Sequence, residues 1–253
     1  MRHVDFSAYN QRYNDSDIER IASVCKNIAS FNFCECCKLS DQIVFILSYY
    51  CCNIIELNIR GCVEVTDEGI DNICTGCPLI ERLDISKCFR LTPHSMDMIT
   101  NAYPKLKSIN TSYCVSFRDA TILTLTEKCP LIDTLHTSYI TDKAFIKVME
   151  VYGHQLQHLT LVWCNEISVD ALHLIPTCCP NLITLCISFC EHASNEFLMY
   201  SIVKSCPKLI IFEQCGLRNV FPEIVRAIQQ IIEHRRNQLP ESVIREVKEY
   251  IIF

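Results

Sequence analysis

Apolar positions recur along this chain with a period of about 26 residues, which is a length typical of stacked structural repeats. Within each period an apolar anchor residue is followed by apolar residues three and five positions later, as in Ile54, Leu57 and Ile59. This alternation is typical of a short strand with one buried face, and the following stretch of about ten to fifteen residues has helical spacing. The anchors are Met1, Ile28, Ile54, Ile80, Leu106, Ile132, Leu156, Leu182 and Leu209, and the interval is shortest between Ile132 and Leu156.

A repeat of one strand and one helix cannot bury its own apolar face, so successive copies must stack into a solenoid. A strand and a helix at fixed period are the signature of leucine-rich repeats. We therefore expect an α/β fold: a right-handed leucine-rich-repeat horseshoe, similar to ribonuclease inhibitor, with a parallel sheet on its concave face. The predicted domains are residues 1–216, a solenoid of about eight to nine coils, and residues 217–253, a C-terminal helical cap.

The cap is predicted from two amphipathic patterns after the repeat frame fades at Cys215. Pro222 suits the first turn of a helix. The apolar stripe of this first helix consists of Ile224, Ile228, Ile231 and Ile232, and that of a second helix after Leu239 and Pro240 consists of Val243, Ile244, Val247, Tyr250 and Ile251.

Nineteen cysteines are present, and twelve of them follow the repeat. Six lie eight positions after an anchor (Cys36, Cys62, Cys88, Cys114, Cys164, Cys190) and six lie three positions before one (Cys25, Cys51, Cys77, Cys129, Cys179, Cys206). Periodic cysteines behave as small buried apolar residues. Coils stacked about 5 Å apart could form disulfides by geometry, but a reducing compartment prevents them.

Two cysteine clusters are the candidates for a metal site. Cys74 and Cys77 form a Cys-x-x-Cys pair inside a helical segment, without a second pair at zinc-finger distance. In the cluster of Cys34, Cys36 and Cys37, Cys36 already has a repeat role. We interpret both clusters as structural and predict no metal and no cofactor.

The second half of each repeat carries a more specific pattern, as in the segment from Cys62 to Ile70 that leads on to Cys77 and Pro78. Over residues 1–216 it resembles the cysteine-containing leucine-rich repeats of F-box/leucine-rich-repeat proteins and of antagonist-of-mitotic-exit-network proteins. The resemblance to F-box proteins implies substrate selection for an SCF-type cullin-RING ubiquitin ligase. The first coil begins at Met1, which leaves no room for a preceding F-box. Residues 239–251 resemble the opening helix of an F-box, but capping is the favoured interpretation of this segment over docking of a ligase adaptor.

Charge and composition narrow the partner classes. The net charge of −6 and the pI near 5.8 argue against nucleic acid as a partner. No apolar run is long enough to span a bilayer, and the N-terminus lacks the pattern of a secretory signal. We expect a cytoplasmic or nuclear protein without a membrane partner.

Catalytic motifs are missing from the sequence: there is no Gly-rich phosphate loop, nucleophile elbow or His-Glu-x-x-His helix. The repeat frame does place His136, His158 and Cys186 on neighbouring strands, which could bring a thiol and imidazoles together. We favour ordinary polar residues of a strand face and predict that the protein is not an enzyme.

The strand face is the predicted binding surface. Alternation sends positions two, four and six after each anchor to the concave, solvent-exposed side. The candidate protein-binding residues there are Glu56, Asn58, Arg60, Arg82, Asp84, His136 and His158. Position seven adds an aromatic edge of Tyr113, Tyr139, Trp163 and Phe189. Aromatic residues are enriched at protein interfaces, although large side chains here could equally shield the turn from water.

The predicted function is therefore a non-enzymatic protein-recognition scaffold, with substrate recognition for an SCF-type ligase as its leading form. In that form its partners include a Skp-type adaptor and a cullin. The alternative is a leucine-rich-repeat interaction or inhibitor protein unrelated to ubiquitin transfer.

Overall fold

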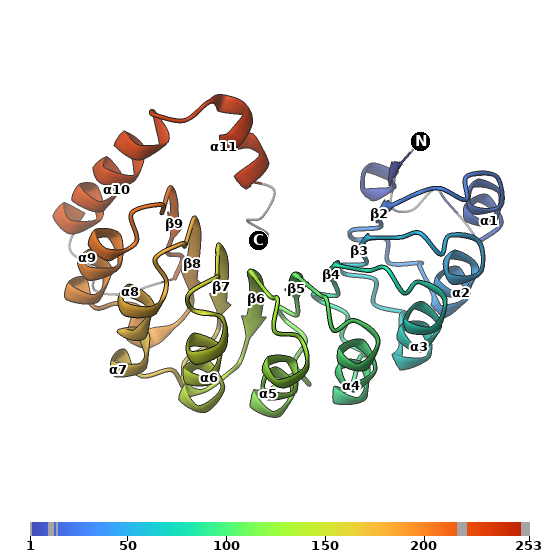
Figure 1. Cartoon of the computed structure of the whole chain (residues 1–253), viewed down its shortest axis with the longest axis horizontal. Helices are drawn as coiled ribbons and strands as arrows, with labels where there is room; N and C mark the ends of the chain where they lie inside the picture. The colour runs from blue at the N-terminus through green and yellow to red at the C-terminus, as the bar shows by residue number, and fades with distance from the viewer. Residues whose placement is uncertain (1, 10–12, 14, 217–221, 249–253) are drawn as a thin grey trace. The chain divides into compact units, whose positions relative to one another are not determined.

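The computed structural model describes residues 2–9, 13, 15–216 and 222–248 (Figure 1). Its contacts divide the chain into two compact units, Met1–Leu131 and Ile132–Phe253. In both units strands and helices alternate along the chain, as the repeat predicts.

The first unit contains five parallel strands that neighbour one another in sequence order. They are β1 (His3–Asp5), β2 (Ser30–Asn32), β3 (Glu56–Asn58), β4 (Arg82–Asp84) and β5 (Ser108–Asn110). The helices are α1 (Asp15–Val24), α2 (Asp41–Tyr50), α3 (Asp67–Gly76), α4 (Pro93–Ala102) and α5 (Asp119–Lys128), with a 3₁₀ turn at Ser7–Tyr9. The helices lie side by side on one side of the strands (Figure 1).

The second unit contains four parallel strands, again in sequence order: β6 (Thr134–Ser138), β7 (His158–Val162), β8 (Thr184–Ser188) and β9 (Ile211–Glu213). Its repeat helices are α6 (Asp142–Tyr152), α7 (Val169–Leu172), α8 (Leu174–Cys178) and α9 (Glu196–Ser205), with a 3₁₀ turn at Glu191–Ala193. Two further helices follow, α10 (Pro222–Arg236) and α11 (Glu241–Lys248).

Strand register follows the anchor spacing predicted from the sequence. Ser30 pairs with Glu56, and Glu56 pairs with Arg82, so each residue meets its equivalent in the next repeat. Thr134 pairs with His158, which reproduces the short interval between the anchors Ile132 and Leu156. Equivalent positions of successive repeats therefore form columns across each sheet, and the predicted α/β leucine-rich-repeat solenoid with parallel strands is confirmed.

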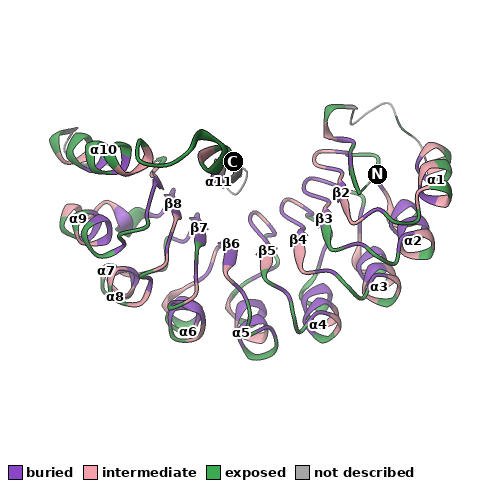
Figure 2. Ribbon diagram, turned by 45° about the horizontal axis from the view of Figure 1, so that its top comes forward, coloured by how far each residue is buried: buried purple, intermediate pink, exposed green. Residues whose placement is uncertain are grey.

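Apolar residues of the repeat frame form the core between strands and helices. The described anchors, from Ile28 to Leu209, are at most 2% exposed. In the short repeat that lacks the periodic cysteine, Ile140 is buried in its place. The helix faces turned away from the strands are exposed (Figure 2). The frame weakens in the last coil, where Phe212 is only half-buried.

The helix starts also connect neighbouring coils. Thr66 caps α3, and its main-chain N–H and hydroxyl both donate to the carboxylate of Asp41 in the previous coil. Asp67 accepts in the same way from Thr92, the cap of α4. A capping residue satisfies an unpaired N–H of the first helical turn. Here an aspartate of one coil holds the cap of the next, a link that the sequence analysis did not identify.

Helix α10 begins at Pro222, as predicted, and packs on α9. Ile228 and Ile232 of its predicted stripe are buried, but Ile231 is 36% exposed, so the prediction for Ile231 is wrong. Ile231 lies about 100° around the helix from Ile232, which turns its side chain off the packed face. In the predicted second stripe Val247 is buried, but Val243 is 37% exposed, so the prediction for Val243 is wrong. Tyr250 and Ile251, predicted to complete this stripe, lie outside the described residues. The domain boundary between residues 216 and 217 stays a prediction.

Candidate functional site

In the first unit, position four of each coil forms a turn at the end of its strand. The side-chain Oδ1 of Asn58 accepts a hydrogen bond from the main-chain N–H of Arg60 at 2.9 Å, and Asp84 accepts from the N–H of Ser86 at the same distance. The same bond occurs at Asp5, Asn32 and Asn110. Asn and Asp commonly make this local bond to the backbone two residues on. Asn58 and Asp84, predicted as binding residues, therefore shape the backbone.

This turn explains why the strands of the first unit are short. In a parallel sheet the N–H of position six would donate to the carbonyl of position five in the previous coil. In the first unit an Asn or Asp takes that N–H, and each strand is three residues long. In the second unit position four is His136, Thr160 and Cys186 in strands β6, β7 and β8, which are five residues long, and Glu213 in the last strand, β9, which is three residues long.

The periodic cysteine thiols lie at position-five carbonyls that, in the first unit, lack the sheet hydrogen bond from the next strand and accept only a local main-chain N–H, as Ile59 does from Cys62. The thiols of Cys62, Cys88 and Cys114 lie 3.3, 3.1 and 3.1 Å from the position-five carbonyls of Phe33, Ile59 and Ile85. Cys190 makes the equivalent contact to Leu161 at 3.5 Å in the second unit, where the sheet hydrogen bond is retained. Eleven of the twelve periodic cysteines are buried, as predicted, but Cys25 is only half-buried, so the prediction is wrong there. Hydrogen bonding to the preceding coil gives a reason for cysteine at position eight, except that the thiol of Cys164 donates to Val162 of its own coil.

Position seven has a left-handed backbone in every coil from the second to the last. The φ angle is positive at Glu35, Lys87, Tyr113, Tyr139, Trp163 and Phe189, and at Gly61 and Gly216. Such a conformation costs a non-glycine residue roughly 1–2 kcal/mol. It turns the chain at the strand end so that the following position-eight side chain enters the core.

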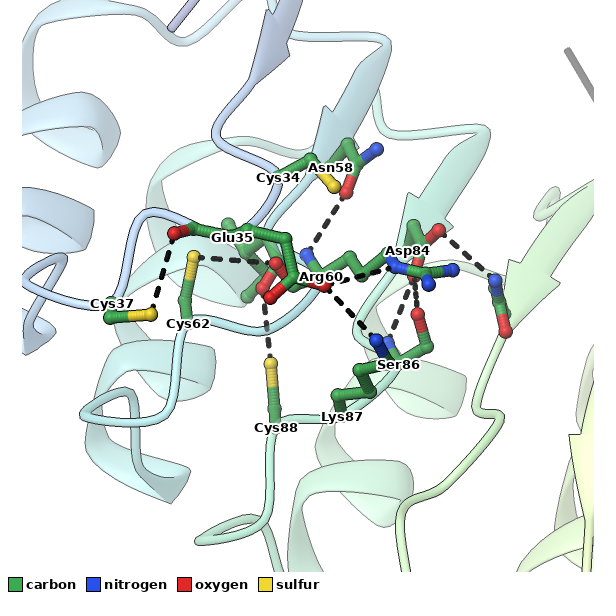
Figure 3. Close-up of polar contacts among 12 residues, drawn as sticks. Cys34, Glu35, Cys37, Asn58, Arg60, Cys62, Asp84, Ser86, Lys87 and Cys88 are labelled. Atoms are coloured by element: carbon green, nitrogen blue, oxygen red, sulfur yellow. Dashed lines mark hydrogen bonds and ion pairs between the residues drawn. The ribbon is translucent and has the colours of Figure 1, made fainter. Parts of the chain in front are cut away.

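A charged cluster occupies this edge in the first unit (Figure 3). Glu35 Oε1 lies 3.5 Å from Arg60 Nε and 3.1 Å from Lys87 Nζ. The carboxylate reaches Lys87, two coils on, because Gly61 has no side chain: a β-carbon on Gly61 would lie 2.7 Å from Glu35 Oε2. Although burial works against ionisation, Lys87 and Arg60 hold the pKa of Glu35 below its usual value.

Glu56 and Arg82 form a second, weaker pair on the strand face, 3.9 Å apart. Glu56 is exposed and Arg82 half-buried. Exposed ion pairs of this kind contribute little to stability.

The prediction of a solvent-exposed strand face is wrong for four candidates: Arg60, Asp84, His136 and His158 are 3–8% exposed. Strands lie about 4.8 Å apart, so side chains of one column pack on the next coil and hydrogen-bond to it. Asp84, for example, also accepts from Asn110 Nδ2 at 3.0 Å. Burial raises the pKa of Asp84 even though Ser86, Arg60 and Asn110 favour its ionised form. In Figure 2 strands β6, β7 and β8 are buried along their length.

The two histidines of the histidine–thiol alternative are also hydrogen-bonded to the next strand. His136 Nδ1 lies 2.6 Å from Thr160 Oγ1, and His158 Nδ1 lies 2.9 Å from Thr184 Oγ1. Thr160 pairs with both His136 and Cys186, so a whole strand separates that imidazole from the thiol. Burial raises the pKa of Cys186 to about 12, which opposes a nucleophilic thiolate.

Two residues of the predicted aromatic edge, Trp163 and Phe189, form a stacked pair. The rings of Trp163 and Phe189 stack with centroids 4.7 Å apart and planes 7° apart. They are 42% and 37% exposed, whereas Tyr113 and Tyr139 are half-buried. Phe189 in turn covers Gly216, where a β-carbon would collide with the phenylalanine ring. The position-seven side chains of Glu35, Trp163 and Phe189 thus lie over the equivalent residue of the next coil.

Among the described residues, no group of three or more His, Cys, Asp or Glu side chains could hold a metal ion. Burial raises the pKa of both Cys74 and Cys77 to about 12, which also opposes thiolate ligation. No described helix is long and apolar enough to cross a membrane.

Comparisons with known proteins identify the fold but no family. No family model matches the sequence, and no curated protein matches it. The structure is similar to that of Rad7, solved as a complex with Elc1 in yeast, with a TM-score of 0.62 and 18% identity over 81% of this chain and 51% of that one. It is also similar to the leucine-rich repeat-containing protein LegL7 from Legionella pneumophila, with a TM-score of 0.51 and 12% identity over 94% of this chain and 81% of that one. The chain therefore spans about half the length of the Rad7 chain that it matches.

Proposed function

We propose that this protein is a non-enzymatic protein-recognition scaffold. The observation that carries the proposal is the exposed stack of Trp163 and Phe189, held on adjacent coils by a left-handed backbone. Large aromatic side chains in fixed orientations bury much area on binding at a small entropic cost, and they dominate many interfaces. The separation of His136 from Cys186, and the raised pKa of that thiol, favour a scaffold over an enzyme.

Substrate recognition for an SCF-type cullin-RING ubiquitin ligase is the specific form that we propose. Its support is the resemblance of the repeats to those of F-box/leucine-rich-repeat proteins and the fold likeness to Rad7, which was solved with a partner protein, Elc1. A cytoplasmic or nuclear location fits this role, since all nineteen cysteines are unpaired. An interaction or inhibitor protein outside ubiquitin transfer would use the same aromatic stack.

Affinity capture from lysate with the full chain tests both forms. The scaffold proposal predicts a set of partners that Trp163→Ala depletes and that Phe197→Ala leaves unchanged. Phe197 is a matched control, because it is an aromatic residue of α9 that is 73% exposed and stacks on no other Phe, Tyr or Trp ring in an observed pair. Capture that is insensitive to Trp163→Ala would contradict the scaffold proposal. Failure to recover a Skp-type adaptor and a cullin would reject the ligase form and leave the alternative.

A further inference from the structure

We propose that the strand-to-helix edge of the second unit binds an arginine- or lysine-bearing segment of a partner protein. The edge consists of Trp163, Glu166, Phe189 and Glu191, and we name it the aromatic–acidic edge. This inference rests on the proposed scaffold function and adds the chemical class of the partner.

The aromatic half offers exposed ring edges, because the stack covers the facing sides of the Trp163 and Phe189 rings. The ring of Phe189 also lies against Gly216. A cation prefers the face of a ring, so the exposed edges suit aliphatic contacts. The methylene stems of Arg and Lys pack on apolar surface while their charged ends reach for polar groups.

The acidic half supplies those polar groups. Glu166 and Glu191 are exposed and follow the two aromatic residues in sequence by three and two positions. Neither of them forms an ion pair with another described residue. In the first unit, by contrast, Glu64 of the equivalent loop pairs with Arg90 at 2.8 Å.

The loops around the edge carry a net negative charge. From position seven into the start of the next helix or 3₁₀ turn, the three coils of residues 139–143, 163–170 and 189–196 carry five carboxylates and one lysine. They are Asp142, Glu166, Asp170, Glu191 and Glu196, with Lys143. Complementary charge selects partners and speeds their association, so the surface matches a cationic segment.

The backbone of the edge is already ordered. Trp163 N donates to Ser188 O at 3.1 Å, and Phe189 N donates to Cys215 O at 2.8 Å. Glu191 N donates to Asn165 Oδ1 at 3.1 Å, which joins the two acidic loops. A surface held in its binding conformation loses less entropy when a partner docks.

Trp163 is the only tryptophan in the chain, so its fluorescence reports on this edge without a label. The probes are three synthetic peptides of equal length in which alanine alternates with arginine, glutamine or glutamate. We expect saturable binding of the arginine peptide only, with a strong loss of affinity at about 0.5 M salt. The double substitution Glu166→Gln and Glu191→Gln should weaken that binding roughly tenfold.

A matched double variant, Glu150→Gln with Glu233→Gln, removes the same charge from helices α6 and α10 and should bind as the parent does. Three results would overturn the inference: no binding of the arginine peptide, equal binding of the glutamine peptide, or equal weakening by both double variants. None of these tests the scaffold proposal, which depends on the Trp163→Ala capture. A partner lost with Trp163→Ala but retained by the Glu166/Glu191 variant would keep the scaffold and reject the cationic partner.

Discussion

The thiol of Cys88 donates a hydrogen bond to the main-chain carbonyl of Ile59, 3.1 Å away in the preceding coil. In a regular parallel sheet that carbonyl would accept from the N–H of Ser86, but Asp84 takes the N–H instead. One turn residue and one cysteine thus act together, and the periodic cysteine is more than an apolar filler.

This relationship predicts coupling between Asp84 and Cys88. Cys88→Ala should lower the free energy of unfolding by about 0.5–1.5 kcal/mol, because the Ile59 carbonyl loses the thiol and keeps only the main-chain N–H of Cys62 as a donor. In an Asp84→Ala background the N–H of Ser86 can return to that carbonyl, so the cost of Cys88→Ala should fall. A double-mutant cycle by urea denaturation measures the coupling. Additivity within about 0.5 kcal/mol would show that the two bonds are independent.

Alkaline pH should destabilise the protein. Burial raises the pKa of Cys36 and Cys51 to about 11 and of Cys77 and Cys179 to about 12. An unfolded thiol titrates near pH 8.5, so above that pH the unfolded chain releases protons that the folded chain retains. The stabilisation is complete below pH 8.5 and is lost as pH rises towards 11–12, by up to about 1.4 kcal/mol per pH unit for each thiol. Denaturation midpoints that stay constant from about pH 8 to pH 10.5 would contradict this expectation.

Asp67 should stabilise the protein at neutral pH and lose that effect in acid. Burial opposes its ionisation, but hydrogen bonds from Ser95 and Thr92 outweigh burial and lower its pKa. Its contribution is therefore present above the unfolded value near pH 3.9 and disappears as pH falls through the folded pKa.

Asp67→Ala should cost about 1–2 kcal/mol at pH 7 and less at about pH 3, measured by chemical denaturation. Asp71→Ala is the control, since Asp71 is an exposed residue of the same helix. Equal losses from Asp67→Ala at both pH values would exclude the linkage.

Gly216 and Gly61 form a matched pair for testing the aromatic stack. Both have a φ of 69°, so alanine should cost a similar backbone strain of about 1 kcal/mol at either position. At Gly216 the new methyl group would also collide with the ring of Phe189, whereas at Gly61 it would meet the flexible Glu35 side chain. We expect Gly216→Ala to shift Trp163 emission and weaken partner capture, and Gly61→Ala to do neither. If the two variants changed Trp163 emission and partner capture equally, the aromatic stack would not be what determines partner binding.

Arg235 should hold α10 on the repeat. Its guanidinium donates to the carbonyls of Val203, Cys206 and Leu209 at 2.9, 3.0 and 3.2 Å, where α9 ends. Arg235→Met should cost about 1–3 kcal/mol by removing a charged donor from those carbonyls, and should raise amide hydrogen exchange throughout α10. Arg226→Met, on an exposed position of the same helix, is expected to leave exchange unchanged. If the amides of α10 stayed protected from exchange in the Arg235 variant, the packing of α10 on the repeat would depend on Ile228 and Ile232 alone.

Sequence periodicity was sufficient for the strand positions, because parallel strands pair at the repeat spacing and Ser30, Glu56 and Arg82 fall into one column. Periodicity could not predict which polar side chains stay exposed. Arg60 and His136 were expected in solvent, yet side chains of adjacent coils cover them. The Asn and Asp residues at position four were visible in the sequence, but their local bond to the backbone was not recognised. The hydrogen bonds of Arg235 were not predicted, because the carbonyls that it contacts belong to the preceding repeat.

The order of apolar residues along the chain is enough to dictate the coil, its register and its buried anchors. The role of the polar and aromatic side chains in the aligned columns is decided only by the tertiary structure. Whether a side chain in a column is exposed, paired or stacked is set by its neighbour in the adjacent coil, across a strand spacing of about 4.8 Å. The exposed stack of Trp163 and Phe189, at position seven, and the buried hydrogen bond between His136 and Thr160, at position four, both form between equivalent residues of adjacent coils.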